Sequence, residues 1–296
     1  MEPTPTILFK NHTGEELAVL LAPFGVNPKL AGKLQSAILR NALDEVPKVI
    51  EQTSWRVLKK VENATRIPTL QLIDKQVSPR DGFTKYLFKG EGDVLKLQEM
   101  NLIRIGEKKK YRVKSSADRE HFFILKKGNL KISLGDKEHV LQVGSMVTVM
   151  PKDQIVFENT EDTMAELYEM TYLAKSRANE ERGLKAGGSF IVPWESAVFK
   201  PTAKGGGRQF FDRATAMLNR FDIHVTTLNV GQQSHDPHTH VNEEIILMID
   251  GNAEERIGDK KELAKPGDVI RLGSKVLHNI TNVGNKPCQY YAIQWN

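Results

Sequence analysis

The sequence predicts a mainly β protein made of two tandem β-barrels preceded by a small α+β N-terminal domain. Residues 1–66 show a helical period, and from about residue 67 short alternating segments are separated by Gly-rich turns. The third observation is an internal repeat at a spacing of 123 residues. With 296 residues, the chain is long enough for two or three domains, each with its own core.

The N-terminal block predicts two amphipathic helices. Asn27 and Pro28 are typical of a helix N-cap followed by a first-turn proline. Apolar residues then recur near the helical period at Leu30, Leu34, Ile38 and Leu43. A second run, residues 53–64, places Trp55, Leu58 and Val61 on one stripe. We expect both stripes to face a core.

Turns and connectors divide the β region into short strands. The segments SPRDG (78–82) and GEGD (90–93) predict turns between strands. Residues 174–187 are polar and charged, so they predict a connector that includes a short helix. The glycines of residues 203–209 predict a flexible loop.

The repeat sets the domain organisation. The segment GNLKISLGDKEHVLQVG (128–144) matches GNAEERIGDKKELAKPG (251–267) in its opening Gly-Asn, its Gly-Asp-Lys turn and its closing glycine. No gap is needed from about residue 115 to residue 172. We therefore predict an accessory domain over residues 1–94, a first barrel over residues 95–186 and a second barrel over residues 187–296.

Composition and charge exclude several classes of protein. The net charge of +5 is mild and does not have the concentrated basic face of a dedicated nucleic-acid binder. The single cysteine, Cys288, excludes an intrachain disulfide and a cysteine-based metal cluster. The N-terminus lacks a signal-peptide pattern, and the apolar run of residues 17–24 is too short to span a membrane. We expect a cytoplasmic protein without a membrane association.

The second copy of the repeat carries a set of metal-ligand side chains. His238 and His240 are two residues apart, and Glu244 follows after three more residues. On a strand these positions share one face, and His278 is expected to join them from a neighbouring strand. Three imidazoles and one carboxylate suit a divalent transition metal, namely Mn, Fe, Zn, Ni or Co.

These four positions carry a resemblance to the cupin superfamily. The order His-x-His, Glu, Gly251 and then His278 resembles its two sequence motifs. The resemblance implies two tandem cupin (RmlC-like) β-barrels, and over residues 95–296 the chain is similar to bacterial two-cupin (bicupin) metalloproteins. Two-cupin proteins of this type are grouped with ureidoglycine aminohydrolases, whose ligands are Glu, His, His and Gln, whereas this chain has His, His, Glu and His.

The first copy of the repeat lacks the ligand set. Subtracting 123 from the ligand positions gives Ser115, Ala117, His121 and Ile155. Because one imidazole alone does not hold a metal ion, we expect one metal per chain, bound in the second barrel. The first barrel is then a structural or dimer-forming unit, and a homo-oligomer is expected.

Three residues near the ligands are candidates for a pocket. His224 lies in a predicted strand and is either a catalytic acid or base or a packed histidine. Gln294 ends the last predicted strand, where it either binds substrate or caps the core. His235 precedes the ligand pair in a loop, where an exposed position is favoured over one at the pocket mouth.

The segment GRQFFDRA carries two candidate substrate-binding arginines. Arg208 and Arg213 could bind a substrate carboxylate at the mouth of the barrel. The alternative, which we favour, is a pairing with Asp212 that fixes the loop.

The N-terminal block has a resemblance of its own. Its helical stretch, its Asp-Gly turn and the strand KYLF (85–88) resemble the accessory domain of radical-SAM methyltransferases that modify adenine in ribosomal RNA. Those enzymes need a cysteine cluster, so the single Cys288 excludes methyl transfer. Cations that could still contact RNA are Lys75, Arg80, Lys85 and Lys89. An RNA partner is not favoured over a unit that packs on the barrels.

Two functions follow from this reading. The first is a metal-dependent enzyme of the dioxygenase, isomerase or hydrolase type that acts on a small polar organic molecule in the second barrel. The alternative is a non-catalytic protein that binds a metal and a small ligand, associated with RNA through its N-terminal domain. The fold alone does not decide between them, because one fold can carry many activities.

Overall fold

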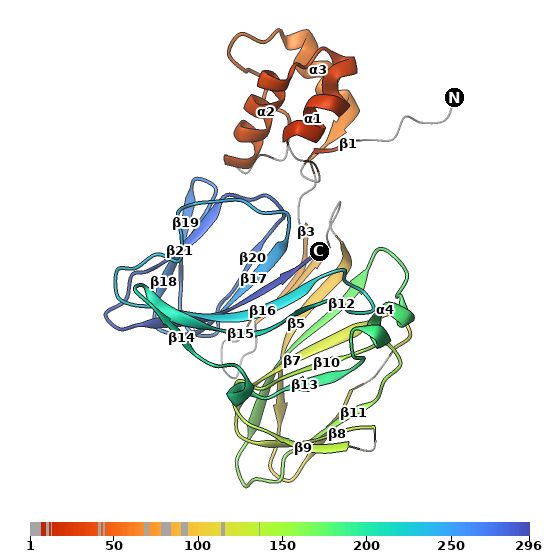
Figure 1. The fold of residues 1–296 in the computed structure, drawn as a ribbon, viewed down its shortest axis with the longest axis vertical. Coiled ribbons are helices and arrows are strands. Elements are labelled where there is room, and N and C mark those ends of the chain that lie inside the picture. The colour runs from red at the N-terminus through yellow and green to blue at the C-terminus, as the bar shows by residue number, and fades with distance from the viewer. Residues whose placement is uncertain are drawn as a thin grey trace.

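The computed structural model confirms a mainly β chain with two barrels and a small helical unit (Figure 1). It describes residues 7–9, 12, 14–40, 43, 45–67, 71–77, 84–89, 94–113, 116–135 and 137–296. Within these residues, none of the helices has the length and the apolar character needed to cross a lipid bilayer.

The N-terminal unit consists of three helices around an apolar core. The helices and a two-stranded parallel pair are α1 (Gly14–Leu21), α2 (Pro28–Arg40), α3 (Trp55–Ala64), β1 (Ile7–Leu8) and β2 (Thr65–Arg66). The predicted cap is confirmed, because the Asn27 side chain accepts a hydrogen bond from the Leu30 N–H at 2.8 Å. Leu58 and Val61 are buried as predicted. Trp55 is 68% exposed, so its expected place in the core is wrong: it lies at the first residue of α3, beyond the packed turns.

Each barrel consists of two antiparallel sheets. The larger sheet of the first barrel has the order β13-β10-β7-β12-β5-β4-β3 and the smaller has the order β6-β11-β8-β9. In chain order their strands are β3 (Gln71–Val77), β4 (Thr84–Lys89), β5 (Leu95–Ile105), β6 (Lys110–Arg112), β7 (Glu120–Lys127), β8 (Leu130–Leu134), β9 (Lys137–Leu141), β10 (Met146–Val149), β11 (Ile155–Glu158), β12 (Ala165–Ala174) and β13 (Phe190–Val192).

The second barrel has the same plan. Its sheets have the orders β14-β15-β16-β22-β17-β20 and β19-β18-β21. The strands are β14 (Lys200–Thr202), β15 (Gly205–Arg213), β16 (Phe221–Leu228), β17 (Glu243–Asp250), β18 (Ala253–Ile257), β19 (Lys260–Ala264), β20 (Val269–Leu272), β21 (His278–Asn282) and β22 (Cys288–Trp295). The connector between the barrels forms α4 (Glu180–Lys185), as the sequence predicts.

The repeat seen in the sequence is also a repeat of strand register. Ala165 pairs with Ile105 in the first barrel, and Cys288 pairs with Leu228, each 123 residues further along, in the second. The strand pairs β7–β12, β7–β10, β8–β9 and β8–β11 have counterparts in the second barrel with the same register. Positions in the two barrels can therefore be compared one by one.

The repeat extends further toward the N-terminus than the sequence suggests. The hairpin β3–β4 pairs with β5 in the large sheet of the first barrel, just as β14–β15 pairs with β16 in the second. Residues 203 and 204 form a turn, as expected, whereas residues 205–209 belong to β15 and are not part of a flexible loop. Gly206 lets the backbones of β14 and β15 come close together, because a Cβ atom at this position would lie only 2.6 Å from the Lys200 carbonyl oxygen. The boundaries at residues 94 and 186 stay predictions.

Some of the predicted residues fall outside what the structure describes. Arg80 and Ser115 lie outside the described residues. Lys75, Lys85 and Lys89 belong to β3 and β4, whose backbone pairing is described. The proposed contact of these cations with RNA is therefore a prediction that rests on the sequence.

One apolar core joins the two barrels. Each barrel has an interior of its own between its two sheets, and a further core lies where the large sheets face each other. In this joint core Phe122 and Tyr172 of the first barrel pack against Phe221 of the second, with ring centroids 5.2 and 5.7 Å apart. The barrels are thus held together by burial of aromatic surface.

Two equivalent glutamates secure this joint core. The Glu120 carboxylate accepts hydrogen bonds from the Thr215 hydroxyl and from the N–H groups of Ala216 and Met217. Its counterpart, Glu243, accepts from the Arg271 guanidinium at 2.7 Å and from the Trp295 indole at 2.8 Å. Glu120 thus bonds to the segment that leads into the second barrel, whereas Glu243 bonds within its own barrel, on the face that also carries Ile245 and Leu247 of the joint core.

Candidate metal centre

The four predicted ligands converge at one end of the second barrel. Glu244 lies in β17, and His278 is the first residue of β21. His238 and His240 precede β17 rather than lying in a regular strand, which corrects the expectation that one strand carries all three motif-one ligands. His238 nevertheless has strand-like pairing, because its backbone exchanges two hydrogen bonds with that of His278, at 3.0 and 3.2 Å.

The ligand atoms lie close together. Glu244 Oε2 is 3.2 Å from Nε2 of His240 and 3.4 Å from Nε2 of His278. The ligand atoms of these three side chains all lie within 4.8 Å of one another. The ring of His238 lies 4.8 Å from that of His278, between centroids. A single ion placed among these atoms would be within reach of several ligands at once.

The surrounding backbone orients the imidazoles for metal binding. Nδ1 of His240 lies 2.8 Å from the carbonyl oxygen of Asn242, and Nδ1 of His278 lies 2.8 Å from that of Val276. Each Nδ1–H can donate to its carbonyl, which leaves the Nε2 lone pair for an ion. Nδ1 of His238 is buried and has no hydrogen-bond partner within the described residues. This donor set fits a divalent transition metal.

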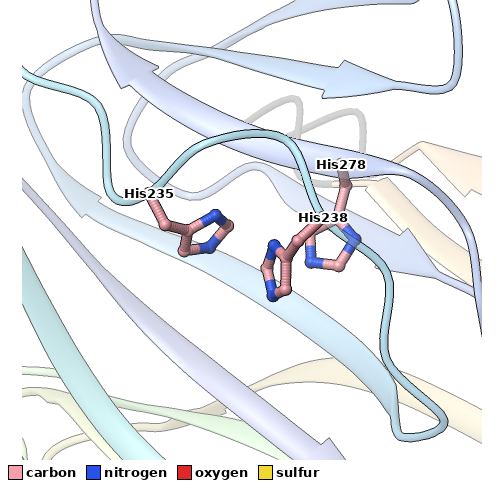
Figure 2. A group of neighbouring side chains, drawn as sticks. All are labelled: His235, His238 and His278. Carbon is pink, nitrogen blue, oxygen red and sulfur yellow. The ribbon is translucent and has the colours of Figure 1, made fainter.

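A fifth side chain, His235, reaches the same cluster. Its ring stands nearly perpendicular to that of His238, with centroids 3.9 Å apart, and Figure 2 shows it extending from the loop toward His238 and His278. His235, His238 and His278 form a second set whose ligand atoms lie within 4.8 Å of one another. His235 is solvent-accessible, as the favoured expectation has it, but it also lines the mouth of the cavity. The sequence holds a signal for it in the spacing His-x-x-His-x-His.

The electrostatics of the cluster favour ionised Glu244 and neutral His238. Burial alone would raise the pKa of Glu244, but its hydrogen bonds to His240 and His278 outweigh burial and lower the pKa to about 2. Burial, assisted by the neighbouring imidazoles, lowers the pKa of His238 to about 4. For His240, burial opposes the charged form, yet the Glu244 carboxylate raises the pKa. A carboxylate and a neutral imidazole are the protonation states that bind metal ions.

The ligands line a small cavity of about 230 Å³. The other residues lining it are His224, Thr226, Ser234, Ile246, Glu255, Ile280, Tyr290, Ala292 and Gln294. Glu255 is 1% exposed and was not among the residues singled out from the sequence. The run Ala-Glu-Glu-Arg by itself does not indicate that Glu255 is buried. The internal repeat does indicate it, because the residue equivalent to Glu255 in the first barrel is Ile132.

His224 and Gln294 lie where the sequence predicts. Both line the cavity. His224 has its Nδ1 3.8 Å from Oδ1 of Asp222, a buried carboxylate that also accepts hydrogen bonds from Gln209 and Arg220. Burial opposes ionisation of Asp222, but the neighbouring His224 imidazole and the hydrogen bond from Gln209 lower its pKa overall. The structure thus brings an imidazole with an adjacent carboxylate to the wall of the metal cavity.

Arg208 and Arg213 do not line the cavity. The Arg208 guanidinium lies 4.9 Å from the centre of the Trp194 ring and donates to the Ala197 carbonyl. Arg213 stacks on Phe190 at 3.6 Å. The structure therefore does not bring them to the cavity where they were expected to hold a substrate carboxylate, because both side chains pack on aromatic rings elsewhere. Asp212 does form an Asp–Arg pair, but with Arg220 at 2.8 Å and not with Arg208 or Arg213.

The first barrel has a different set of side chains at the equivalent place. His121 occupies the position of Glu244, and its Nδ1 lies 3.1 Å from Oε1 of Glu169 and 3.2 Å from Oγ1 of Thr171. Ile155, the counterpart of His278, is buried. Neither of the ligand groups found among the described residues lies in this barrel.

Comparison with known protein families supports this assignment of the fold. Residues 224–294 match the family described as Cupin domain; the match runs from within β16 to within β22 and includes all four predicted ligands. No match was found among curated proteins.

Solved structures share the fold over about three quarters of the chain. A glyoxylate-induced protein of Pseudomonas aeruginosa superimposes with a TM-score of 0.58 at 12% identity, covering 77% of this chain and 89% of that one. Oxalate decarboxylase of Lactobacillus farciminis gives 0.56 at 10% identity, with 77% and 86% covered. AerE of Microcystis aeruginosa gives 0.55 at 14% identity, with 75% and 97% covered. At these identities the likeness establishes the two-barrel cupin fold.

Proposed function

We propose that this chain is a metal-dependent cupin enzyme that acts on a small polar organic molecule in its second barrel. His238, His240, Glu244 and His278 would hold one divalent transition metal. The observation that carries the proposal is the convergence of these side chains on a cavity of about 230 Å³, with two imidazoles turned toward the carboxylate by backbone carbonyls.

A bound divalent ion would polarise a substrate oxygen or lower the pKa of a bound water molecule. The protein's own residues would supply the rest. The Asn242 and Val276 carbonyls hold the ligand rings in place. His224, positioned beside Asp222, is placed to take or give a proton at its ring nitrogen. The hydroxyls of Thr226 and Tyr290 and the amide of Gln294 offer hydrogen bonds to a polar ligand.

The reaction classes that fit this site are dioxygenation, isomerisation and hydrolysis. Oxalate decarboxylase, which has a similar fold, is an enzyme, but at 10% sequence identity its activity cannot be assigned to this chain. A non-catalytic metal and ligand binder is the alternative. The imidazole of His224 beside the Asp222 carboxylate favours the enzyme, because a binding protein needs no such pair.

Elemental analysis of the full-length protein, purified without added metal, tests the metal centre. We expect about one transition metal ion per chain in the wild type and none in His240→Ala. A thermal-shift screen of small polar metabolites on the metal-loaded protein then tests the ligand. A wild-type protein with no bound metal, and no uptake on adding Mn, Fe, Zn, Ni or Co, would contradict the proposal.

Three expectations from the sequence stay predictions. They are a homo-oligomeric state, a cytoplasmic location, and an RNA contact through the N-terminal unit. The last is disfavoured by the mixture of charges in that unit, where Glu62 pairs with Lys59 at 2.6 Å instead of leaving it free for phosphate.

A further inference from the structure

Glu255 is a buried carboxyl group in the interior of the second barrel. It lies in the middle of β18 and is 1% exposed, and neither of its oxygens has a hydrogen-bond partner within the described residues. The flanking residues point outward, where Glu254 pairs with Lys261 at 2.7 Å and Arg256 donates to the Gly258 carbonyl. Buried polar groups are almost always hydrogen-bonded, so a group that lacks a partner calls for a functional explanation.

The barrel itself does not need an acid at this position. The counterpart of Glu255 in the first barrel is Ile132, which pairs with Phe157 just as Glu255 pairs with Ile280. Ile132 is fully buried in an apolar interior. At this interior position the first barrel has the aliphatic side chain of Ile132, whereas the second barrel has the carboxyl group of Glu255. The carboxyl appears in the barrel that holds the ligand set.

The cavity limits what could partner Glu255. It is smaller than the roughly 300–1,000 Å³ of pockets for drug-sized ligands. Among the described residues, none of those lining the cavity is Lys or Arg. The negative charge of a ligand would therefore have to face the histidines and their metal. A ligand oxygen that points away from the histidines would meet Glu255. This residue lines the cavity but belongs to neither set of clustered ligand atoms.

We propose that Glu255 is a catalytic acid that donates a hydrogen bond, and then its proton, to an oxygen of a small oxo- or hydroxycarboxylate bound in this cavity. In that transfer the Glu255 O–H bond breaks, an O–H bond forms on the ligand, and Glu255 is left as a carboxylate that regains its proton from solvent. This inference rests on the proposed metal centre, and it names the substrate class and a proton donor for it.

The protonation state agrees with the geometry. Burial, with a smaller contribution from the negative charge of Glu244, raises the pKa of Glu255 to about 8. The pKa values of the two carboxyl groups in the cavity therefore differ: Glu244 favours the ionised form and Glu255 favours the protonated form. Such a separation is typical of sites that divide ligand and acid roles between two carboxyls.

Binding of pyruvate to the zinc-loaded, full-length protein tests the inference. Titration calorimetry between pH 6 and 9 would compare the wild type with Glu255→Gln, Glu255→Ile and the outward-facing control Glu254→Gln. At pH 7 we expect Glu255→Gln, whose amide can still donate, to bind within about 3-fold of the wild type, and Glu255→Ile to bind at least about 10-fold more weakly. Wild-type affinity should fall at high pH as Glu255 loses its proton, and this fall should vanish in Glu255→Gln.

Several results would overturn the inference. These are no binding of pyruvate to zinc-loaded wild type, full affinity in Glu255→Ile, or an unchanged pH profile in Glu255→Gln. A second measurement is independent of metal: Glu255→Ile, which copies the first barrel, should melt at a higher temperature than the wild type at pH 7, and a lower melting temperature would contradict the absence of a partner. A wild type that binds no zinc would instead overturn the proposed metal centre, and the ligand class with it.

Discussion

The two barrels share one backbone plan and differ in what fills it. The strand pairs at the centre of the two barrels have the same register at a spacing of 123. At the ligand positions the second barrel has three imidazoles and a carboxylate, whereas the described positions of the first have Ala117, His121 and Ile155. The difference teaches that one backbone plan accepts either set of inward-facing side chains, of which the second-barrel set is the one that could hold a metal ion.

The largest difference we expect between the barrels is in metal affinity. His240→Ala and His278→Ala each remove a ligand of the second barrel and should weaken metal binding at least about 100-fold, since even loss of a supporting group costs about 10–100-fold. His121→Ala, the matched change in the first barrel, should keep about one ion per chain. Elemental analysis and competition with a chelator measure both. A metal content that falls in His121→Ala would show that the first barrel is also a metal site.

Exchanging the residues at the shared interior position should have opposite effects on stability. We expect Glu255→Ile to stabilise the protein by about 1–3 kcal/mol and Ile132→Glu to destabilise it by at least as much, because each moves an unpartnered carboxyl out of or into a barrel interior. The free energy of unfolding from urea denaturation measures both changes. If both changes had small effects of equal size, burial of the Glu255 carboxyl would not be costly, and this prediction would be wrong.

The effect of Glu255→Ile should also grow with pH. The folded protein keeps the Glu255 proton up to about pH 8, whereas the unfolded chain releases it near the ordinary value of 4.5. Between these values the folded state binds more protons, so wild-type stability falls as the pH rises through this window. Removing the carboxyl removes that fall. Denaturation at pH 5 and pH 8 should show a larger gain in Glu255→Ile at pH 8.

A comparable loss of stability is expected on both sides of the joint core. Glu120→Ala leaves the buried N–H groups of Ala216 and Met217 without their acceptor, and Glu243→Ala leaves the Arg271 charge and the Trp295 indole with fewer partners. Each change should cost at least about 2 kcal/mol, given about 1–3 kcal/mol per buried group left unpaired. Calorimetric unfolding would test this, and a cost confined to one of the two would show that the contact between the barrels is asymmetric.

The smallest effects should be the most similar in the two barrels. Asn159 donates to the carbonyls of Ile105 and Thr163, and its counterpart Asn282 donates to those of Leu228 and Lys286. Changing either to Ala should cost about 1–2 kcal/mol. Parallel urea titrations would compare them, and a difference above about 1 kcal/mol would mean that the two loops are not energetically equivalent.

The sequence predicts the barrels and the clustering of the proposed metal ligands well, because both depend on local spacing. A repeat of 123 residues and the order of His238, His240, Glu244 and His278 are visible without any coordinates. The ligands lie as predicted on facing elements, although the first two precede β17 rather than belonging to it. Local patterns are enough where the chemistry depends on a few residues close together.

Long-range packing accounts for what the sequence does not show. Nothing local indicates that β3–β4 joins the sheet of the first barrel, since that requires pairing with β5. Arg208 and Arg213 lie in a charged segment, which by itself suggests solvent exposure, yet both guanidinium groups pack on aromatic rings of residues 190–199. Glu255 has acidic and basic neighbours, so only the comparison with Ile132 points to its burial.

The joint core between the large sheets resembles the interface of a dimer whose two subunits have been fused into one chain. In a dimer of separate chains, such a contact weakens as the protein is diluted. Here the connector that contains α4 holds the two partners at a high effective concentration whatever the amount of protein present. One partner can therefore give up its own site and serve as a permanent support for the other, since dilution cannot separate them.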